Sequence, residues 1–329
     1  MMDDDELTRR LRAARPETPP RNAPPSLAAE RVLRRIVADP TEHRGAARGR
    51  VPARGRVGGP VWLAAASVLV LIAVAVLGGI SLLRPPAAVA ATPALLVAEP
   101  VSGTARENLM SISESVRAEG IGASDVVRFQ TWALSFDPES GEPPAQIVPE
   151  EHLIRRSADG AVEIEVRAGT PTAADGTAVP DPTPAPGTVL WTDTRPAGEG
   201  AGFFGDVPGS AAEMPDFFRA SGVLVGESSG EYFSAVRLLL SERTLDAEQQ
   251  AALVEFLATL PDVAVDGSVT DRLGRRGVSV STDSRAPGEY RDTLVLSAAQ
   301  GVLAYEATYI GSSRTDIPSP AVIEYVAWR

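Results

Sequence analysis

The sequence predicts an α+β fold, with helices packed on one face of a curved antiparallel sheet and one transmembrane helix before it. Three observations lead to this prediction. An apolar run of 23 residues without a charge occupies positions 61–83. Amphipathic helical patterns dominate 210–260, and alternating strands separated by short Gly, Asp and Ser turns fill 263–329. The repeated strand–helix alternation of a parallel sheet does not occur in the sequence.

The apolar run from Val61 to Leu83 is expected to span a membrane. As a helix it would be roughly 35 Å long, enough to cross a hydrocarbon core of about 30 Å with some tilt. A signal peptide has a shorter apolar region, of about 7–15 residues, close to its start. Here sixty residues precede the run. Cleavage at the small-residue stretch 87–91 is the alternative to a retained anchor.

Charge on either side of the run predicts its orientation. After Arg84 the next basic residue is Arg106, whereas five arginines crowd the preceding side: Arg44, Arg48, Arg50, Arg54 and Arg56. The positive-inside rule therefore places the N-terminus in the cytoplasm and the C-terminal domain outside the plasma membrane. That domain carries all of the negative excess behind the chain's net charge of −12. Such acidity repels nucleic acid.

Residues 1–60 form the predicted cytoplasmic segment, made of two short helices and an Arg-rich, disordered linker. Helices of about 12 residues are marginal alone in water. The second helix nevertheless carries an apolar stripe, so we expect residues 1–40 to bind a cytoplasmic protein, with Leu27, Leu33 and Ile36 as contacts. The rival interpretation is that these helices lie on the anionic inner leaflet.

Beyond the span we expect an Ala/Pro-rich stalk at 84–100 and an α+β domain at 101–329. The first predicted helix, 103–119, has Leu109, Ile112 and Val116 on one face. A strand is expected at 126–136. The turn "ADG" then joins two strands of a hairpin. In the second strand Val162, Ile164 and Val166 are expected to be buried, and they alternate with Glu163, Glu165 and Arg167, which are expected to face solvent.

The rest of the domain is predicted as a short strand, three helices and a meander of strands. The strand is "TVLWTDT", and the helices cover 210–221, 231–242 and 246–260. Asp246 and Gln249 have the spacing of a capping box at the start of the last helix. The closing strands are expected at 263–271, 276–284, 292–300, 301–311 and 321–329.

The C-terminal block carries a resemblance to a known family. The residues are Leu260, Pro261, Gly267, Asp271, Arg272, Gly274, Arg275, Gly277 and Gly301. They resemble the C-terminal part of an actinobacterial family of single-pass membrane proteins, often encoded beside extracytoplasmic-function sigma factors. The resemblance implies an anti-sigma-like regulator with a half-barrel outer domain, like LolA-type lipoprotein carriers and RseB-type envelope-stress sensors. The sequence "LSAAQG" departs from that family, whose members tend to carry an Asp-Pro turn there.

Two glycine motifs invite a catalytic interpretation. "GESSG", at 226–230, fits the G-x-S-x-G nucleophile elbow, but the hydrolase order requires a later His, and both His residues lie upstream. Ser228 with Glu231 also fits a helix cap, which is the interpretation we favour. "GAGFFG", at 200–205, is followed by Pro and Gly instead of a helix, so a loop is expected there.

No other pattern indicates catalysis, a metal or a cofactor. The chain has no Cys, and His152 lacks a second His or Cys partner, so a solvated strand position is expected for it. Asp271, Arg272, Gly274 and Arg275 are expected to form a turn, with ligand contact as the alternative. Trp132, Trp191 and Trp328 are expected in the core, with the lining of an apolar cavity as the alternative.

The sequence therefore predicts a protein that is not an enzyme. The first hypothesis is a membrane-anchored regulator or sensor of the anti-sigma type, whose inner segment contacts a sigma factor or another cytoplasmic protein. The second is a tethered module that binds envelope lipid or lipoprotein without a signalling role. An open apolar cavity between helices and sheet would favour the second hypothesis, and a cavity filled by the domain's own Leu and Phe side chains would count against it.

Overall fold

The computed structural model describes residues 89–120, 122–136, 144–198 and 202–329. The segment 1–60 that is predicted to be cytoplasmic, with Leu27, Leu33 and Ile36, and the predicted span with its ends Val61 and Leu83, lie outside the described residues. Within the described ranges, no helix combines the length and the apolarity needed to cross a bilayer. The described residues belong to the C-terminal domain and to the end of the predicted stalk.

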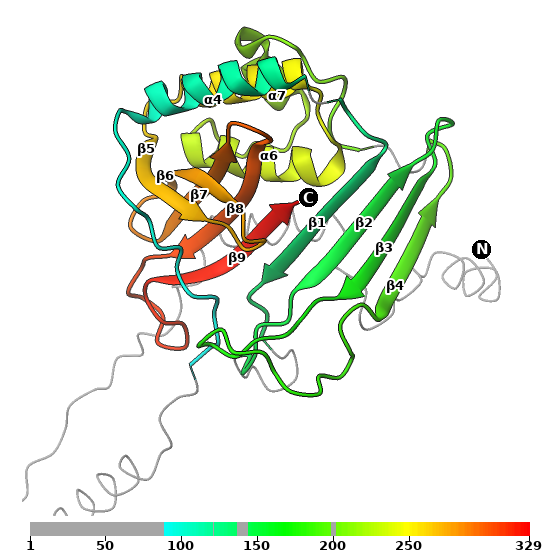
Figure 1. Cartoon of the computed structure of the whole chain (residues 1–329), viewed down its shortest axis with the longest axis vertical. Coiled ribbons are helices and arrows are strands. Elements are labelled where there is room, and N and C mark those ends of the chain that lie inside the picture. Colours follow the sequence, from blue (N-terminus) through cyan, green and yellow to red (C-terminus); the bar gives the residue numbers. More distant parts are fainter. Residues whose placement is uncertain (1–88, 121, 137–143, 199–201) are drawn as a thin grey trace, which may run out of the picture. The chain divides into compact units, whose positions relative to one another are not determined.

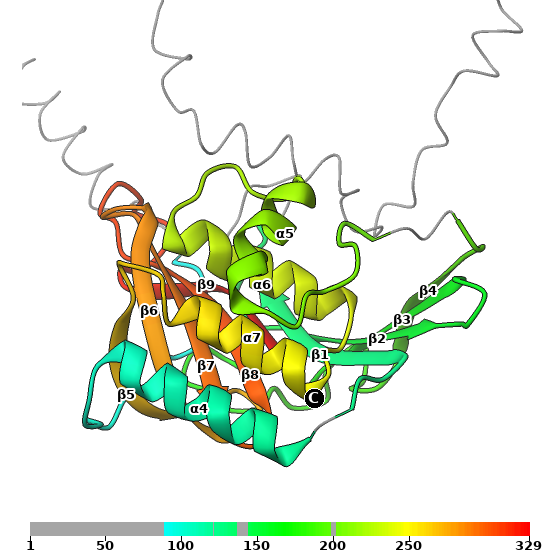
Figure 2. The ribbon, with the colours of Figure 1, turned by 90° about the horizontal axis from the view of Figure 1, so that it is seen from above.

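The domain is α+β, and its described strands form one open, nine-stranded antiparallel sheet (Figure 1). The strand order is β4-β3-β2-β1-β9-β8-β7-β6-β5, so two meanders meet where the first strand pairs with the last. The curvature of this sheet is visible in Figure 2. The bounds are β1 Val126–Ala133, β2 Glu150–Arg156, β3 Val162–Ala168, β4 Val189–Arg195, β5 Ala264–Thr270, β6 Arg276–Ala286, β7 Tyr290–Ser297, β8 Gly301–Tyr309 and β9 Ala321–Trp328.

The helices agree closely with the predicted patterns. Thr104 and Glu107 form a capping box that starts α4 (Ala105–Glu119), whose buried face includes the predicted apolar positions. A short 3-10 turn (Ala211–Glu213) leads into α5 (Met214–Ala220). The side chain of Ser228 caps α6 (Ser229–Glu242). The predicted Asp246–Gln249 capping box starts α7 (Ala247–Leu257).

Helix α6 is the centre of the core. It is buried on nearly all sides because it contacts β1, β6, β7 and β9 and because its Tyr232 ring packs against Phe218 of α5 and Phe256 of α7. Helices α4 and α7 lie side by side as an outer layer (Figure 2). The space between helices and sheet is filled by side chains without any solvent exposure, among them Phe218, Phe233, Leu239, Leu253, Leu257, Leu294 and Leu296. This half of the domain is therefore a packed core.

Residues 89–100, predicted as the second half of a stalk, pack against the domain. Ala90 and Ala91 are buried, and their backbone N–H groups donate to the carbonyls of Asp316 and Pro144. Glu99 exchanges two backbone hydrogen bonds with Ser268 on the outer edge of β5. This bridge covers part of an edge strand that would otherwise be unpaired.

Candidate functional site

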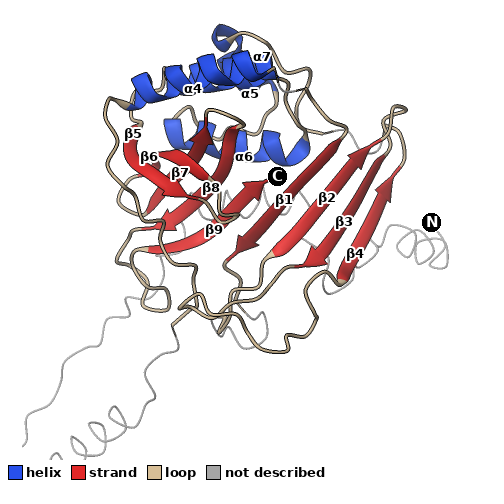
Figure 3. Cartoon of the chain, viewed as in Figure 1, coloured by secondary structure: helices blue, strands red, loops and turns tan. Residues whose placement is uncertain are grey.

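The sheet extends beyond its helices. In the described part of the chain, helices lie over β6–β9 and part of β1, whereas β2, β3 and β4 continue past them (Figures 1 and 3). We call β1–β4 the wing, and the face of the wing on the helix side the wing face. Phe129 and Val127 identify that face, because both belong to the same hydrophobic cluster as α6 and α7. The wing face is the candidate functional site.

One transverse row of large side chains crosses the wing face. The strand registers place Trp328 of β9 opposite Phe129, Phe129 opposite His152, His152 opposite Val166, and Val166 opposite Trp191. Five strands thus contribute one aligned residue each. Because residues two apart on a strand share a face, the neighbouring row holds three aliphatic residues: Val127, Ile154 and Ile164.

The rings in this row contact one another. The Phe129 and His152 rings are stacked with centroids 4.8 Å apart, and His152 meets Trp191 edge to face at 6.5 Å. The His152 side chain is 17% exposed, and its Nε2 lies 3.0 Å from Oε2 of Glu150. The prediction of a solvated position for His152 is therefore wrong. The register directs this side chain to the apolar face between two aromatic neighbours.

Charged side chains stand at both ends of the wing face. Glu150 lies at one end, and Arg156 and Arg195 lie in one row at the other end, on either side of Val162. Arg156 donates from Nε to the carbonyl of Glu242, the last residue of α6, at 3.2 Å. Arg195 pairs with Asp193 at 2.9 Å, and both of those side chains are more than 40% exposed. The wing face therefore has an apolar centre and a rim with charges of both signs.

Three of the chain's four tryptophans lie in the C-terminal domain, and their environments differ. Trp132 lies on the opposite face of the sheet, where it stacks on Tyr325 at 6.4 Å and belongs to a separate small cluster with Ile147 and Val322. Trp328 is 7% exposed and is part of the main core. Of the three, only Trp191, on the edge strand β4, is half-buried. Core packing accounts for Trp132 and Trp328, and Trp191 is the one that remains for a surface function.

The "GESSG" motif is a structural element at the start of α6. The Ser228 side chain accepts a hydrogen bond from the N–H of Glu231, as a helix cap does. The N–H of Gly230 donates to Oγ of Ser284 at 3.0 Å. A Cβ on Gly230 would lie 2.8 Å from Oδ2 of the fully buried Asp292. Ser228 therefore caps α6, and Gly230 allows α6 to lie close to the sheet.

Asp292 is the centre of a buried polar network beneath α6. Its carboxylate accepts two hydrogen bonds from Arg285, at 2.9 and 2.7 Å, and one from the hydroxyl of Tyr305 at 2.7 Å. Burial, and after it the Asp292 charge, raises the pKa of Tyr305 well above its ordinary value. Every oxygen of this carboxylate has a partner, so the network stabilises the core and offers no free group for chemistry.

The described part of the "GAGFFG" motif, residues 202–205, fastens its segment to α6. A Cβ on Gly202 would collide with the Glu242 carboxylate at the end of that helix. This carboxylate accepts from the N–H of Phe203 at 2.7 Å and pairs with Arg243 at 2.7 Å. Gly202 therefore makes room for the carboxylate that holds the segment against the helix.

The residues singled out in "DRLGRRG" form the turn between β5 and β6. Asp271 accepts from the N–H groups of Leu273 and Arg275, and its side chain pairs with that of Arg275. Gly274 has a φ of 80°, which favours glycine. Arg272 binds the buried Glu306 of β8 through two hydrogen bonds, of 2.7 and 3.0 Å. Burial raises the pKa of Glu306, and Arg272 opposes that shift.

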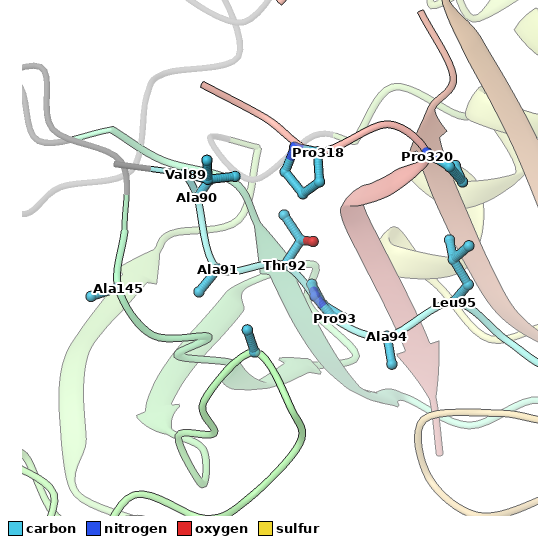
Figure 4. A pocket seen from close by; sticks show the side chains of 11 residues that line it. Val89, Ala90, Ala91, Thr92, Pro93, Ala94, Leu95, Ala145, Pro318 and Pro320 are labelled. Atoms are coloured by element: carbon cyan, nitrogen blue, oxygen red, sulfur yellow. The ribbon is translucent and has the colours of Figure 1, made fainter. Parts of the chain in front are cut away.

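A shallow apolar hollow lies where residues 89–95 pass Pro318 and Pro320 (Figure 4). Its volume is about 610 Å³, and Ala, Pro and Val side chains make up most of its lining. Among the described residues that line it, Thr92 supplies the one polar side chain. In the same described ranges, no group of three or more His, Asp or Glu side chains is placed to hold a metal ion.

No protein-family model, curated protein or solved structure matches this chain. The anti-sigma and half-barrel relationships inferred from the C-terminal motif therefore stay predictions. The wing face was not predicted from the sequence, although the "ADG" turn that sets the pairing of β2 with β3 was. The bond from the N–H of Ser157 to the carbonyl of Ala161 closes the "ADG" turn, and that closure places His152 opposite Val166.

Proposed function

We propose that this chain is a membrane-anchored regulator of the anti-sigma type. Its C-terminal domain binds a ligand or partner through the wing face, outside the membrane. Its inner segment contacts a cytoplasmic protein through Leu27, Leu33 and Ile36. In this proposal the open, curved sheet is a half-barrel, and the predicted span 61–83 connects the two binding regions.

One observation carries the proposal: the wing face has the composition of a core but no described helix over it. A sheet with an apolar face normally buries that face against a second layer. Over β6–β9 this layer consists of α4, α6 and α7. Over β2–β4, Ile154, Ile164 and Trp191 are only half-buried, whereas Val162 and Val166 on the same face are buried. An apolar surface with a polar rim is typical of a binding site.

A tethered lipid or lipoprotein carrier is the alternative. It requires an open apolar cavity between helices and sheet, large enough to enclose an acyl chain. The packing of Phe233, Leu239 and Leu253 fills that space over β6–β9. This packing favours the regulatory proposal over the carrier. In either function, binding outside the membrane would have to use the wing face.

The proposal is tested by co-purification from the membranes of the native host. The full-length protein, solubilised and captured by a C-terminal tag, is expected to bring down a cytoplasmic sigma factor. The double substitution Leu33→Asp and Ile36→Asp should abolish this capture without releasing the protein from the membrane. Substitution of Arg9 and Arg10 by Ser, which lowers the positive charge outside that stripe, is the matched control.

Capture of the sigma factor by the wild type and the control, but not by the double variant, supports the regulatory role. Binding of a peptide of residues 1–40 to vesicles of anionic lipid, without capture of any cytoplasmic protein by the full chain, contradicts it.

A further inference from the structure

The chain joins the domain at one end of the sheet. Ala90 and Ala91 are the first buried residues of the described chain. Their N–H groups donate to the carbonyls of Asp316, in the β8–β9 loop, and Pro144, in the β1–β2 loop. Because neighbouring strands of this sheet are antiparallel, their connections alternate between two ends. We call the end with these two loops the tether end and the opposite one the far end.

The two ends are separated by the length of a strand. β8 runs from the far end to the tether end, and its nine residues, at about 3.3 Å each, cover about 30 Å. The β1–β2 and β8–β9 loops of the tether end lie along the lower edge of the sheet in Figure 1. Two exposed alanines mark the far end: Ala158 in the β2–β3 turn and Ala299 in the β7–β8 turn.

The connection between the predicted span and the domain is short. The span is predicted to end at Leu83, so seven residue steps separate it from the buried Ala90. A fully extended chain of that length covers at most about 25 Å, which is less than the length of β8. The predicted stalk 84–100 would have reached much farther, but residues 89–100 pack against the domain. The tether end is therefore held close to the membrane surface.

The surface at this junction is apolar and uncharged. It is the hollow between residues 89–95 and the two prolines of the β8–β9 loop (Figure 4). None of the described residues that line the hollow is charged, although 22% of the chain's residues are. Val89 and Leu95 in its lining are 54% and 45% exposed. Asp316 beside it pairs with Arg314, so these two residues add no net charge. Exposed apolar surface of this kind marks contact with a protein or a membrane.

We propose that the tether end lies on the outer leaflet, with Val89, Leu95 and Pro318 in contact with the zwitterionic headgroup layer. The short connection brings this surface to the membrane, and burial of its apolar side chains in the interface holds it there. The acidity of the domain makes anionic headgroups a poor partner. The far end, with the turn 271–275, then points away from the membrane. This inference rests on the proposed function, because it requires the predicted span, and it adds the face on which the domain meets the bilayer.

The test uses the full-length protein in phosphatidylcholine nanodiscs that hold one copy each. The chain has no Cys, so a single introduced Cys is the only site for an NBD fluorophore. Val89→Cys and Pro318→Cys place the label at the hollow, and Ala158→Cys and Ala299→Cys place it at the far end as controls. A nitroxide on the lipid headgroup quenches any label that touches the headgroup layer. Position 318 is decisive because the fold, and not the connection to the span, determines where it lies.

Quenching is expected to be several-fold stronger at the two hollow positions than at the two far-end positions. It should persist in about 1 M salt, where the Debye length is about 3 Å, because an apolar contact is not screened. Leu95→Asp should weaken the quenching at position 318, whereas Val97→Asp, which is 84% exposed but outside the hollow, should not. Urea denaturation identifies any labelled protein that has failed to fold, and Ser319→Cys then replaces Pro318→Cys.

Three results would overturn the inference. They are equal quenching at positions 318 and 299, loss of the quenching at high salt, and a blue-shifted NBD emission at 318 without quenching, which would mean that protein covers the hollow. Failure of the inference differs from failure of the proposed function. If position 318 is not quenched while the sigma factor is still captured, only the inference fails. If position 318 is quenched while no cytoplasmic protein is captured, the regulatory proposal fails and the membrane contact stands.

Discussion

Substitution of Gly230 by Ala tests the structural account of the "GESSG" motif. The new Cβ would lie 2.7 Å from Cβ of Arg285, 2.8 Å from Oδ2 of Asp292 and 2.9 Å from the backbone N of Arg285. The backbone N of Arg285 is fixed in the sheet, and Oδ2 of Asp292 is held by a hydrogen bond from Arg285. Neither atom can move aside, so α6 must move away from the sheet. Overpacking of this kind costs about 1–3 kcal/mol, and the higher helix propensity of Ala offsets at most about 1 kcal/mol.

The expected net loss is therefore about 1–2 kcal/mol in the free energy of unfolding. Urea denaturation of the full-length protein in detergent, monitored by tryptophan fluorescence, measures it. Gly226→Ala is the matched control in the same motif, because its Cβ would meet only a side-chain carbon of Glu231 at 3.9 Å. A Gly230→Ala protein as stable as the Gly226→Ala protein would refute the close approach of helix and sheet.

Buried contacts make three further variants informative. Gly202→Ala should destabilise the domain by about 1–3 kcal/mol in urea denaturation, whereas Gly205→Ala, with open space around its Cβ, should not. Arg272→Met should lower the free energy of unfolding by about 3 kcal/mol because it leaves a buried carboxylate without its partner. Arg276→Met removes an exposed ion pair and an exposed hydrogen bond to Ser268 and should lower it by less than about 1 kcal/mol. Burial raises the pKa of Tyr305, so the stability that its neutral form contributes is complete below about pH 10 and is lost as the pH rises further. Tyr305→Phe loses the hydrogen bond to Asp292 and should be less stable at neutral pH, but its stability should fall less steeply than that of the wild type in an alkaline titration.

Local patterns in the sequence predicted the elements well. The capping boxes depend on residues three positions apart, and the hairpin alternation depends on residues two apart. Both were therefore legible without tertiary information. Boundaries moved where tertiary contacts decide them. The predicted strand 126–136 ends at Ala133, where its pairing with β9 stops at Glu324.

The candidate site was much harder to predict. Its row of aligned side chains depends on the pairing of β1 with β9, which joins residues almost 200 positions apart. No turn fixes that register, so it cannot be derived from local spacing. The face on which His152 lies could not be predicted, because "EEHLIRR" has charges at both ends and no regular alternation of apolar and polar residues. The extension of the wing past the described helices is likewise a property of tertiary packing.

The measurement that tests the central claim most directly is the transcriptional output of the proposed sigma-factor partner, once co-purification has identified it, in cells that carry wing variants. Trp191→Ala removes the half-buried ring from the wing face, and Thr192→Ala changes the next residue of β4, which points to the opposite face. Loss of an aromatic anchor at a binding surface typically costs about 2 kcal/mol or more. The output is expected to change several-fold for Trp191→Ala and to stay at the wild-type level for Thr192→Ala. Wild-type output from both variants, with both proteins present in the membrane at normal abundance, would contradict the claim that the wing face regulates the inner segment.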